Sequence, residues 1–172
     1  MAESTDMPDP EAISDTASIT GPDAVPGDAS TSAEAAPRFG WSGRYELQHA
    51  EMDGIHQEFV LLVDALLHAP DEEVAGRLDA LMAHTRHHFE RETTWMQLSA
   101  FPPIHCHERE HAKVVEVAAT VRERVAAGEY ELGRTLAAGL VEWFEIHADT
   151  MDRVLAIWMT QRRLDDDGGA AA

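Results

Sequence analysis

The chain has 172 residues, enough for one domain of ordinary size with a buried core, and its 32 acidic and 13 basic residues give a formal net charge of −19. So negative a chain argues against nucleic acid and anionic membranes as partners, because both require positive charge on the protein. The single cysteine, Cys106, excludes an internal disulfide framework and fits a reducing, cytoplasmic compartment.

The N-terminal segment differs in composition from the rest of the chain. Residues 1–37 contain no lysine or arginine, and Pro, Ser, Thr, Asp and Ala dominate. Such a segment cannot bury enough apolar surface to offset its chain entropy, so we predict a disordered acidic tail over residues 1–40. The end of the chain, DDDGGAAA at 165–172, is predicted to be disordered as well. No secretory signal and no apolar stretch long enough to span a bilayer is visible.

Residues 41–164 show helical periodicity of their apolar side chains throughout, with no strand-like alternation. Four helices are expected, at about 53–68, 70–98, 102–128 and 130–163. Asp53 is a good N-cap for the first of them. Short links between four helices favour an antiparallel up-down arrangement, so the predicted fold class is all-α, a four-helix bundle.

The second helix carries polar residues on its apolar stripe. At steps of three and four, the stripe runs through Val74, Leu78, Leu81, Thr85, His88, Glu92 and Trp95. His88 and Glu92 therefore occupy core positions, whereas His87 and Glu90 lie on other faces. His84 sits one step off the stripe and remains the main rival for an inward-facing role.

Each of the other three helices also places histidine on its buried seam. His56 leads the stripe of the first helix, and His107 and His111 lie one turn apart on the third. On the fourth helix, the stripe is Leu136, Leu140, Trp143, His147 and Val154. Asp152 follows His147 by five residues, about 140° round an ideal helix, so periodicity alone does not place it in the core.

A cluster of this kind favours a metal centre over isolated core histidines. A lone histidine on an apolar face is usually a hydrogen-bonded core residue. Here five such histidines and a glutamate share the seams of four helices, and no lysine or arginine falls on those stripes to neutralise the carboxylate. Imidazoles are good ligands for iron, copper, nickel and zinc, and carboxylates can balance or bridge metal charge.

Four segments resemble the hemerythrin family, and bacterial hemerythrins in particular. They are WSGRYELQHAEMDGIHQEF at 41–59, HFERE at 88–92, FPPIHCHEREH at 101–111 and WFEIHADTMD at 143–152. Each segment alone is a weak signal. Their order and spacing on successive helices make the resemblance specific, and it covers residues 41–164.

The resemblance implies a non-heme centre of two iron ions, bridged by an oxo or hydroxo group. The ligands of one iron would be His107, His111 and His147, those of the other iron His56 and His88, and the bridging carboxylates Glu92 and Asp152. The second iron would keep an open position, where dioxygen binds in the family. Five histidines and two carboxylates also differ from the four carboxylates and two histidines of ferritin-like oxidases, which favours reversible dioxygen binding.

The chain departs from the family's usual pattern beside the last histidine. Members commonly carry a leucine where Phe144 stands, against the dioxygen pocket, and often an isoleucine where Ala148 stands. A larger ring at 144 and a smaller side chain at 148 can exchange volume, in the manner of a volume-conserving core swap. We therefore expect Phe144 to line the dioxygen pocket, with simple packing of the bundle as the alternative.

These inferences predict a non-enzymatic protein that binds dioxygen reversibly for storage, delivery or transport, as a monomer or weak homo-oligomer. Two alternatives stay open. One is a sensor of oxygen, nitric oxide or redox state that signals to a protein partner through the tail. The other is a di-iron enzyme with peroxidase-like or nitric-oxide-reductase-like activity.

Overall fold

The structure, a computed structural model, describes the backbone of residues 38–169 and the side chains of residues 38–162. Nearly all of the predicted N-terminal tail therefore lies outside the described residues. The helices are α1 (Ala50–Leu67), α2 (Asp71–Leu98), α3 (Ile104–Ala126), α4 (Tyr130–His147), the π-helical turn η2 (Ala148–Asp152) and α5 (Arg153–Gly169), preceded by the short 3-10 helix η1 (Gly43–Tyr45).

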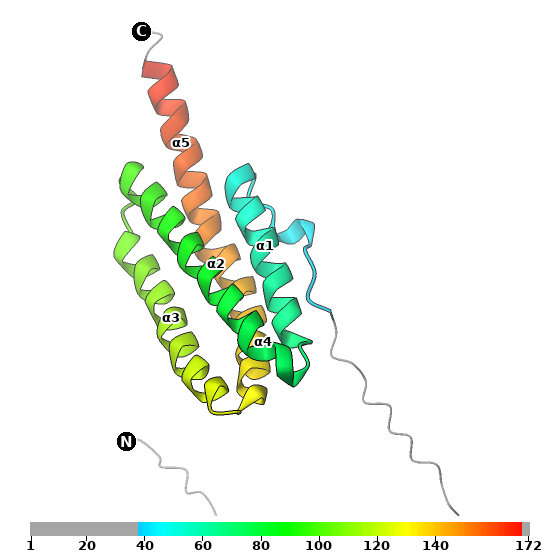
Figure 1. Cartoon of the computed structure of the whole chain (residues 1–172). Helices are drawn as coiled ribbons and strands as arrows, with labels where there is room; N and C mark the ends of the chain where they lie inside the picture. Colours follow the sequence, from blue (N-terminus) through cyan, green and yellow to red (C-terminus); the bar gives the residue numbers. More distant parts are fainter. Residues whose placement is uncertain (1–37, 170–172) are drawn as a thin grey trace, which may run out of the picture. The chain divides into compact units, whose positions relative to one another are not determined.

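The described residues form a four-helix bundle, which confirms the predicted fold class (Figure 1). Successive helices pack side by side, and α4 closes the ring by packing on α1. The fourth member of the bundle is α4 continued through η2 into α5. Strands are absent between residues 38 and 169, and none of the helices there is both long and apolar enough to cross a membrane.

The first helix begins earlier than its sequence predicts. It starts at Ala50, and its N-cap is His49, whose ring Nδ1 accepts a hydrogen bond from the backbone N–H of Met52 at 3.2 Å. Asp53 lies inside the first turn, where its carboxylate accepts the backbone N–H groups of Leu47 at 2.8 Å and His49 at 3.2 Å. The predicted Asp53 cap was therefore wrong, because a histidine takes a role that Ser, Thr, Asp or Asn usually fills.

The fourth helical segment changes its winding rather than breaking at its glycines. Gly133 and Gly139 both lie within α4, and the irregularity comes later, at η2. There the backbone N–H of Arg153 bonds to the carbonyl of Ala148, five residues earlier, which inserts one residue into the turn. The buried stripe consequently moves from the predicted Val154, which is exposed, to Leu155, which is fully buried.

Both ends of the described region extend past the boundaries expected from composition. Phe39 is buried, and its backbone N–H donates to Asp64 Oδ1 at 2.9 Å, while Arg38 forms an ion pair with the same carboxylate at 2.8 Å. At the other end, α5 continues to Gly169, through five residues that the sequence assigned to the C-terminal tail. Residues 170–172 lie outside the described residues.

Two apolar clusters fill the bundle, with a polar layer between them. On α1, His56 lies between Met52, which belongs to the smaller cluster, and Phe59, which belongs to the larger one. The other helices repeat this order, so each of them contributes polar residues at the same level. The smaller cluster consists of Leu47, Met52, Met96, Phe101, Leu155, Ala156 and Met159.

The close approach of α4 to α2 gives a test of the packing. A methyl group added at Gly133 would lie 2.6 Å from Cγ1 of the buried Val74, whereas nothing lies within 4 Å of the same position at Gly139. We expect Gly133→Ala to lower the free energy of unfolding by about 1–3 kcal/mol through overpacking. Gly139→Ala should raise it by about 0.5–1 kcal/mol, because glycine is a poor helix former. Urea denaturation measures both, and equal stabilisation by the two variants would contradict the α2–α4 contact.

Candidate metal centre

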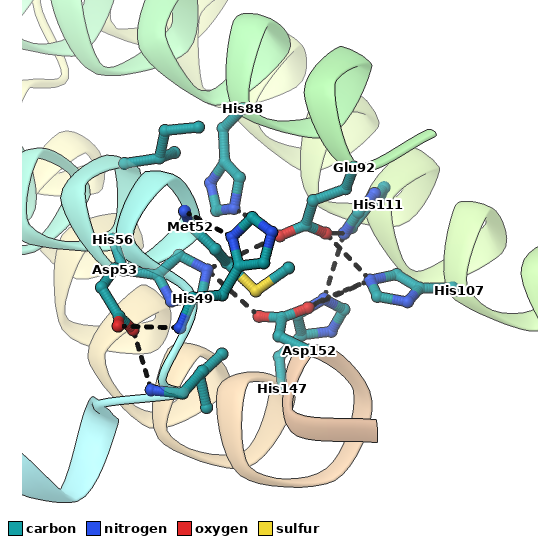
Figure 2. A network of polar contacts seen from close by, with 12 residues as sticks. His49, Met52, Asp53, His56, His88, Glu92, His107, His111, His147 and Asp152 are labelled. Atoms are coloured by element: carbon teal, nitrogen blue, oxygen red, sulfur yellow. Dashed lines mark hydrogen bonds and ion pairs between the residues drawn. The ribbon is translucent and has the colours of Figure 1, made fainter. Parts of the chain in front are cut away.

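Seven polar side chains from all four members of the bundle converge in the layer between the two apolar clusters (Figure 2). Each is at most 4% exposed to solvent. They are His56 from α1, His88 and Glu92 from α2, His107 and His111 from α3, His147 from the end of α4 and Asp152 from the end of η2. The structure thus brings together every ligand position that the sequence singled out.

Glu92 divides its two carboxylate oxygens between two groups of imidazoles. Its Oε1 lies 2.8 Å from Nε2 of His88 and 3.6 Å from Nε2 of His56. Its Oε2 lies 3.1 Å from Nε2 of His107 and 3.3 Å from Nε2 of His111. One carboxylate therefore faces two separate sets of nitrogen donors.

Asp152 repeats this division from the opposite side of the layer. Its Oδ2 lies 3.4 Å from Nε2 of His56, and its Oδ1 lies 3.2 Å from Nε2 of both His107 and His147. Figure 2 shows the two carboxylates between the histidine sets, with contacts spreading from each to both sides. The donor atoms form two groups that share Glu92, one with three histidines and one with two.

The η2 turn is what brings Asp152 into this layer. On an ideal α-helix, a residue five positions after His147 lies about 140° away, outside the buried face. The wider π turn bonds each residue to the fifth one before it, so Asp152 returns to the face of His147 and is fully buried. Sequence periodicity could not show this, because it assumes regular α-helical winding.

The contacts among these side chains fit a cation rather than an internal hydrogen-bond network. Nε2 of His147 lies 3.0 Å from Nε2 of both His107 and His111, so three ring nitrogens point at one another. Both carboxylate oxygens of Asp152, Oε2 of Glu92 and Nε2 of His56 are buried and lack a hydrogen-bond partner. Buried polar atoms are normally paired, and nitrogen and carboxylate donors around a common point are what a transition-metal ion requires.

The electrostatics of the layer are those of two ionised carboxylates among imidazoles. Burial raises the pKa of Glu92, but the surrounding histidines, His88 foremost, outweigh it and hold that pKa well below its usual range. Burial and the Glu92 charge raise the pKa of Asp152, and the histidines again lower it overall. Burial lowers the pKa of His107, yet the two carboxylates raise it to about 9. Without a metal, the negative charge of the layer is balanced by protons on imidazoles.

Burial acts more strongly on His111 than the carboxylates do. It lowers the pKa of this ring to about 4, so His111 is neutral at physiological pH, the form in which an imidazole binds metal. Phe89 stacks on the same ring, with centroids 3.6 Å apart and planes within 3°. Trp143 likewise stacks on His147 at 4.3 Å. Phe89 was not among the residues predicted for the site, although its position directly after His88, on the edge of the buried stripe, indicated a place beside the layer.

The rival histidine of α2 makes its contacts outside this layer. Nε2 of His84 lies 3.2 Å from the backbone carbonyl oxygen of Ile55, and its Nδ1 lies 3.5 Å from Oε2 of Glu58. Its ring centroid is 6.1 Å from that of His88. Both ring nitrogens thus face α1, and His84 belongs to neither group of donor atoms.

Comparison with known proteins agrees with this geometry. The family model for the hemerythrin HHE cation binding domain matches residues 48–158. A bacteriohemerythrin from Ralstonia nicotianae is 41% identical over 136 residues, which cover 79% of this chain and 99% of that protein. The chain belongs to the hemerythrin family. The resemblance that the four sequence segments indicated is therefore confirmed.

Two further hemerythrins are similar to this member of the family. A bacteriohemerythrin from Methylococcus capsulatus is 30% identical over 82 residues, which cover 48% of this chain and 63% of that protein. A crystal structure of a mutant hemerythrin superposes with a TM-score of 0.60 at 25% identity, and covers 64% of this chain and 87% of that one. The cation-binding layer lies within the residues that the family model matches.

Two substitutions on α2 test which of its side chains contact the bound metal. Since loss of a group that only orients a metal ligand already weakens binding by about 10–100-fold, Glu92→Ala should weaken the binding of Fe(II) by at least about 100-fold. His84→Ala should leave it unchanged. Anaerobic titration with Fe(II), followed by a count of retained iron, measures both. If His84→Ala weakened Fe(II) binding more than Glu92→Ala does, His84 would face the cation and the buried face of α2 would be assigned wrongly.

Proposed function

We propose that this hemerythrin-family protein is a non-heme di-iron protein that binds dioxygen reversibly, for oxygen storage, delivery or transport. The observation that carries the proposal is the division of both carboxylates between two histidine sets. A single metal ion would not require Glu92 and Asp152 each to aim one oxygen at each set. Two ions, one held by each histidine set with both carboxylates shared, would account for all these donor contacts at once.

The two positions differ in the number of imidazoles. His107, His111 and His147 would hold one iron, and His56 and His88 the other, with Glu92 and Asp152 shared. The second iron would then have one protein ligand fewer, which would leave a coordination position for an exogenous molecule. The two irons supply the redox chemistry of dioxygen binding; the chain holds them with neutral imidazole donors and excludes water.

An apolar wall lies beside the two-histidine position. Phe144 is fully buried, and its ring stands edge-on to that of His56 at 5.2 Å and stacks on Phe59 at 5.2 Å. Ala148, one turn further along, is buried in the same apolar cluster. The similarity to the bacteriohemerythrins of Ralstonia nicotianae and Methylococcus capsulatus supports dioxygen as the molecule that this wall encloses.

Reversible binding can be tested on the purified chain. After anaerobic reconstitution, we expect two irons per chain and an absorption band that appears with dioxygen and disappears under argon over repeated cycles. Stopped-flow mixing of the reduced protein with dioxygen separates a carrier from an enzyme, because a carrier forms a lasting adduct and an enzyme turns over. Fewer than one iron per chain would overturn the di-iron centre, and continuous dioxygen consumption would favour the enzymatic alternative.

Both irons should be independent of the N-terminal segment. All seven proposed ligands lie between residues 56 and 152. The Arg38 side chain and the backbone N–H of Phe39 contact Asp64, and the Phe39 ring packs on Tyr45 and Phe144, none of which is a proposed ligand. A chain that lacks residues 1–37 should therefore retain two irons and the dioxygen band. Loss of either on truncation would show that the segment contributes to the centre.

Phe144 is expected to control access to the two-histidine iron. A hydrophobic shell limits the solvent that reaches a metal, so Phe144→Leu should speed dioxygen release and autoxidation by about tenfold, with iron content intact. Rapid-mixing absorption spectroscopy measures both rates.

The matched control is Phe101→Leu, which shortens a buried ring on the three-histidine side, where Phe101 stands edge-on to His107 at 6.5 Å. It should leave the dioxygen release rate close to that of the wild type. If Phe144→Leu lowers only the melting temperature while release and azide binding keep their wild-type rates, Phe144 serves packing alone.

A further inference from the structure

A continuous row of aromatic rings leads from the surface to the two-histidine side of the metal layer. The half-buried Trp41 lies 5.7 Å from Tyr45, Tyr45 lies 5.2 Å from Phe144, and Phe144 lies 5.2 Å from His56, as distances between ring centroids. All of these rings except Trp41 are buried. The segment that carries Trp41 and Tyr45 precedes α1 and contributes no ligand, so metal binding does not explain it.

The phenol of Tyr45 is coupled to a proton acceptor. Its hydroxyl donates a hydrogen bond to Oε1 of Glu145 at 2.9 Å, and the guanidinium of Arg44 contacts both the phenol oxygen and that carboxylate. Burial of the side chain is the largest influence on the pKa of Tyr45 and raises it, so the phenol stays protonated at physiological pH. A phenol that loses an electron must also lose its proton, and Glu145 is within reach to accept it.

From this arrangement we propose that Tyr45 is a one-electron donor to the metal centre. When a peroxide has oxidised the centre, Tyr45 returns electrons to it, and the resulting radical is reduced near the protein surface. The inference rests on the proposed di-iron function and extends it. Tyr45 supplies the electron, Phe144 and His56 carry it inward, and Trp41 is the surface end of the row.

The electrons and protons balance when the peroxide and a reductant are counted. Reduction of H₂O₂ to two molecules of water takes two electrons from the centre and two protons from solvent. Tyr45 transfers these electrons to the centre one at a time. In each such passage its O–H bond breaks, the proton goes to Glu145, and a neutral phenoxyl radical remains. An external hydrogen-atom donor of the ascorbate class restores the O–H bond and the carboxylate is deprotonated again. Two passages complete the reduction of one peroxide.

Trp143 is the other oxidisable ring close to the layer, since it stacks on His147 at 4.3 Å. Within the described part of the chain, however, the indole N–H of Trp143 has no hydrogen-bond acceptor, whereas the Tyr45 hydroxyl donates to Glu145. It also contacts the three-histidine side, away from the position proposed for exogenous molecules. The chain contains only one other tyrosine, Tyr130, which lies in the first turn of α4 and serves as the matched control.

The test is electron paramagnetic resonance of the iron-loaded full chain, frozen shortly after mixing with hydrogen peroxide in the absence of reductant. Ring-deuterated tyrosine identifies a tyrosyl radical by the narrowing of its signal. We expect the signal in the wild type and in Tyr130→Phe, its loss in Tyr45→Phe, and a weaker signal in Glu145→Gln. Tyr45→Phe keeps the ring and its packing, so iron content and the dioxygen band should be unchanged. Zinc-loaded protein should give no radical.

Several results would overturn the proposal: a signal that survives in Tyr45→Phe, one that disappears only in Tyr130→Phe, a tryptophan radical alone, or no radical in iron-loaded wild type. In these cases the iron count and the dioxygen band still stand, so the proposed function survives without the electron route. If the wild type holds no iron, the di-iron function fails first and the electron route falls with it.

Discussion

Two carboxylates buried in the middle of a helical bundle are the constraint on which the rest of the structure depends. Glu92 and Asp152 are fully buried, and among the described residues their ion-pair partners are all histidines. An unpaired buried charge costs several kcal/mol, so the layer needs compensating positive charge from protons or from metal ions. The two apolar clusters on either side keep water out and make this requirement stricter.

One inserted residue in the last helix links several features that lie far apart. The π turn rotates Asp152 onto the face of His147, and it also shifts the register of everything that follows, so Leu155 packs inward and Val154 outward. Arg153, the next residue, donates to the backbone carbonyl oxygens of Arg44 at 3.0 Å and Glu46 at 3.4 Å. The turn that brings Asp152 into the layer therefore also positions Arg153 to hold residues 44–46, in the segment before α1, against the bundle.

The two sides of the layer have different surroundings, and the difference matches their proposed roles. On the three-histidine side, Phe89 stacks on His111 and Trp143 on His147, which fixes the orientation of both imidazoles. On the two-histidine side, Phe144 meets His56 edge-on and continues outward to Tyr45. One side would hold a metal ion with three imidazoles, and the other would combine a position that has one imidazole fewer with an apolar wall and an oxidisable phenol. This asymmetry, rather than the ligand count alone, favours the binding of a small exogenous molecule.

The sequence by itself determined the four-helix class and the burial of six of the seven layer residues, because on regular α-helices a step of three or four keeps a side chain on one face. It located His88 and Glu92 on the buried stripe of α2 in this way. Only the tertiary structure decided the place of Asp152, since a change from α to π winding follows from packing and leaves no mark in a 3.6-residue period. It also decided that His49 caps α1 and that each carboxylate faces both histidine sets. The cap is a side-chain contact at the start of α1 and the carboxylate contacts are distances between helices, and apolar periodicity carries no information about either.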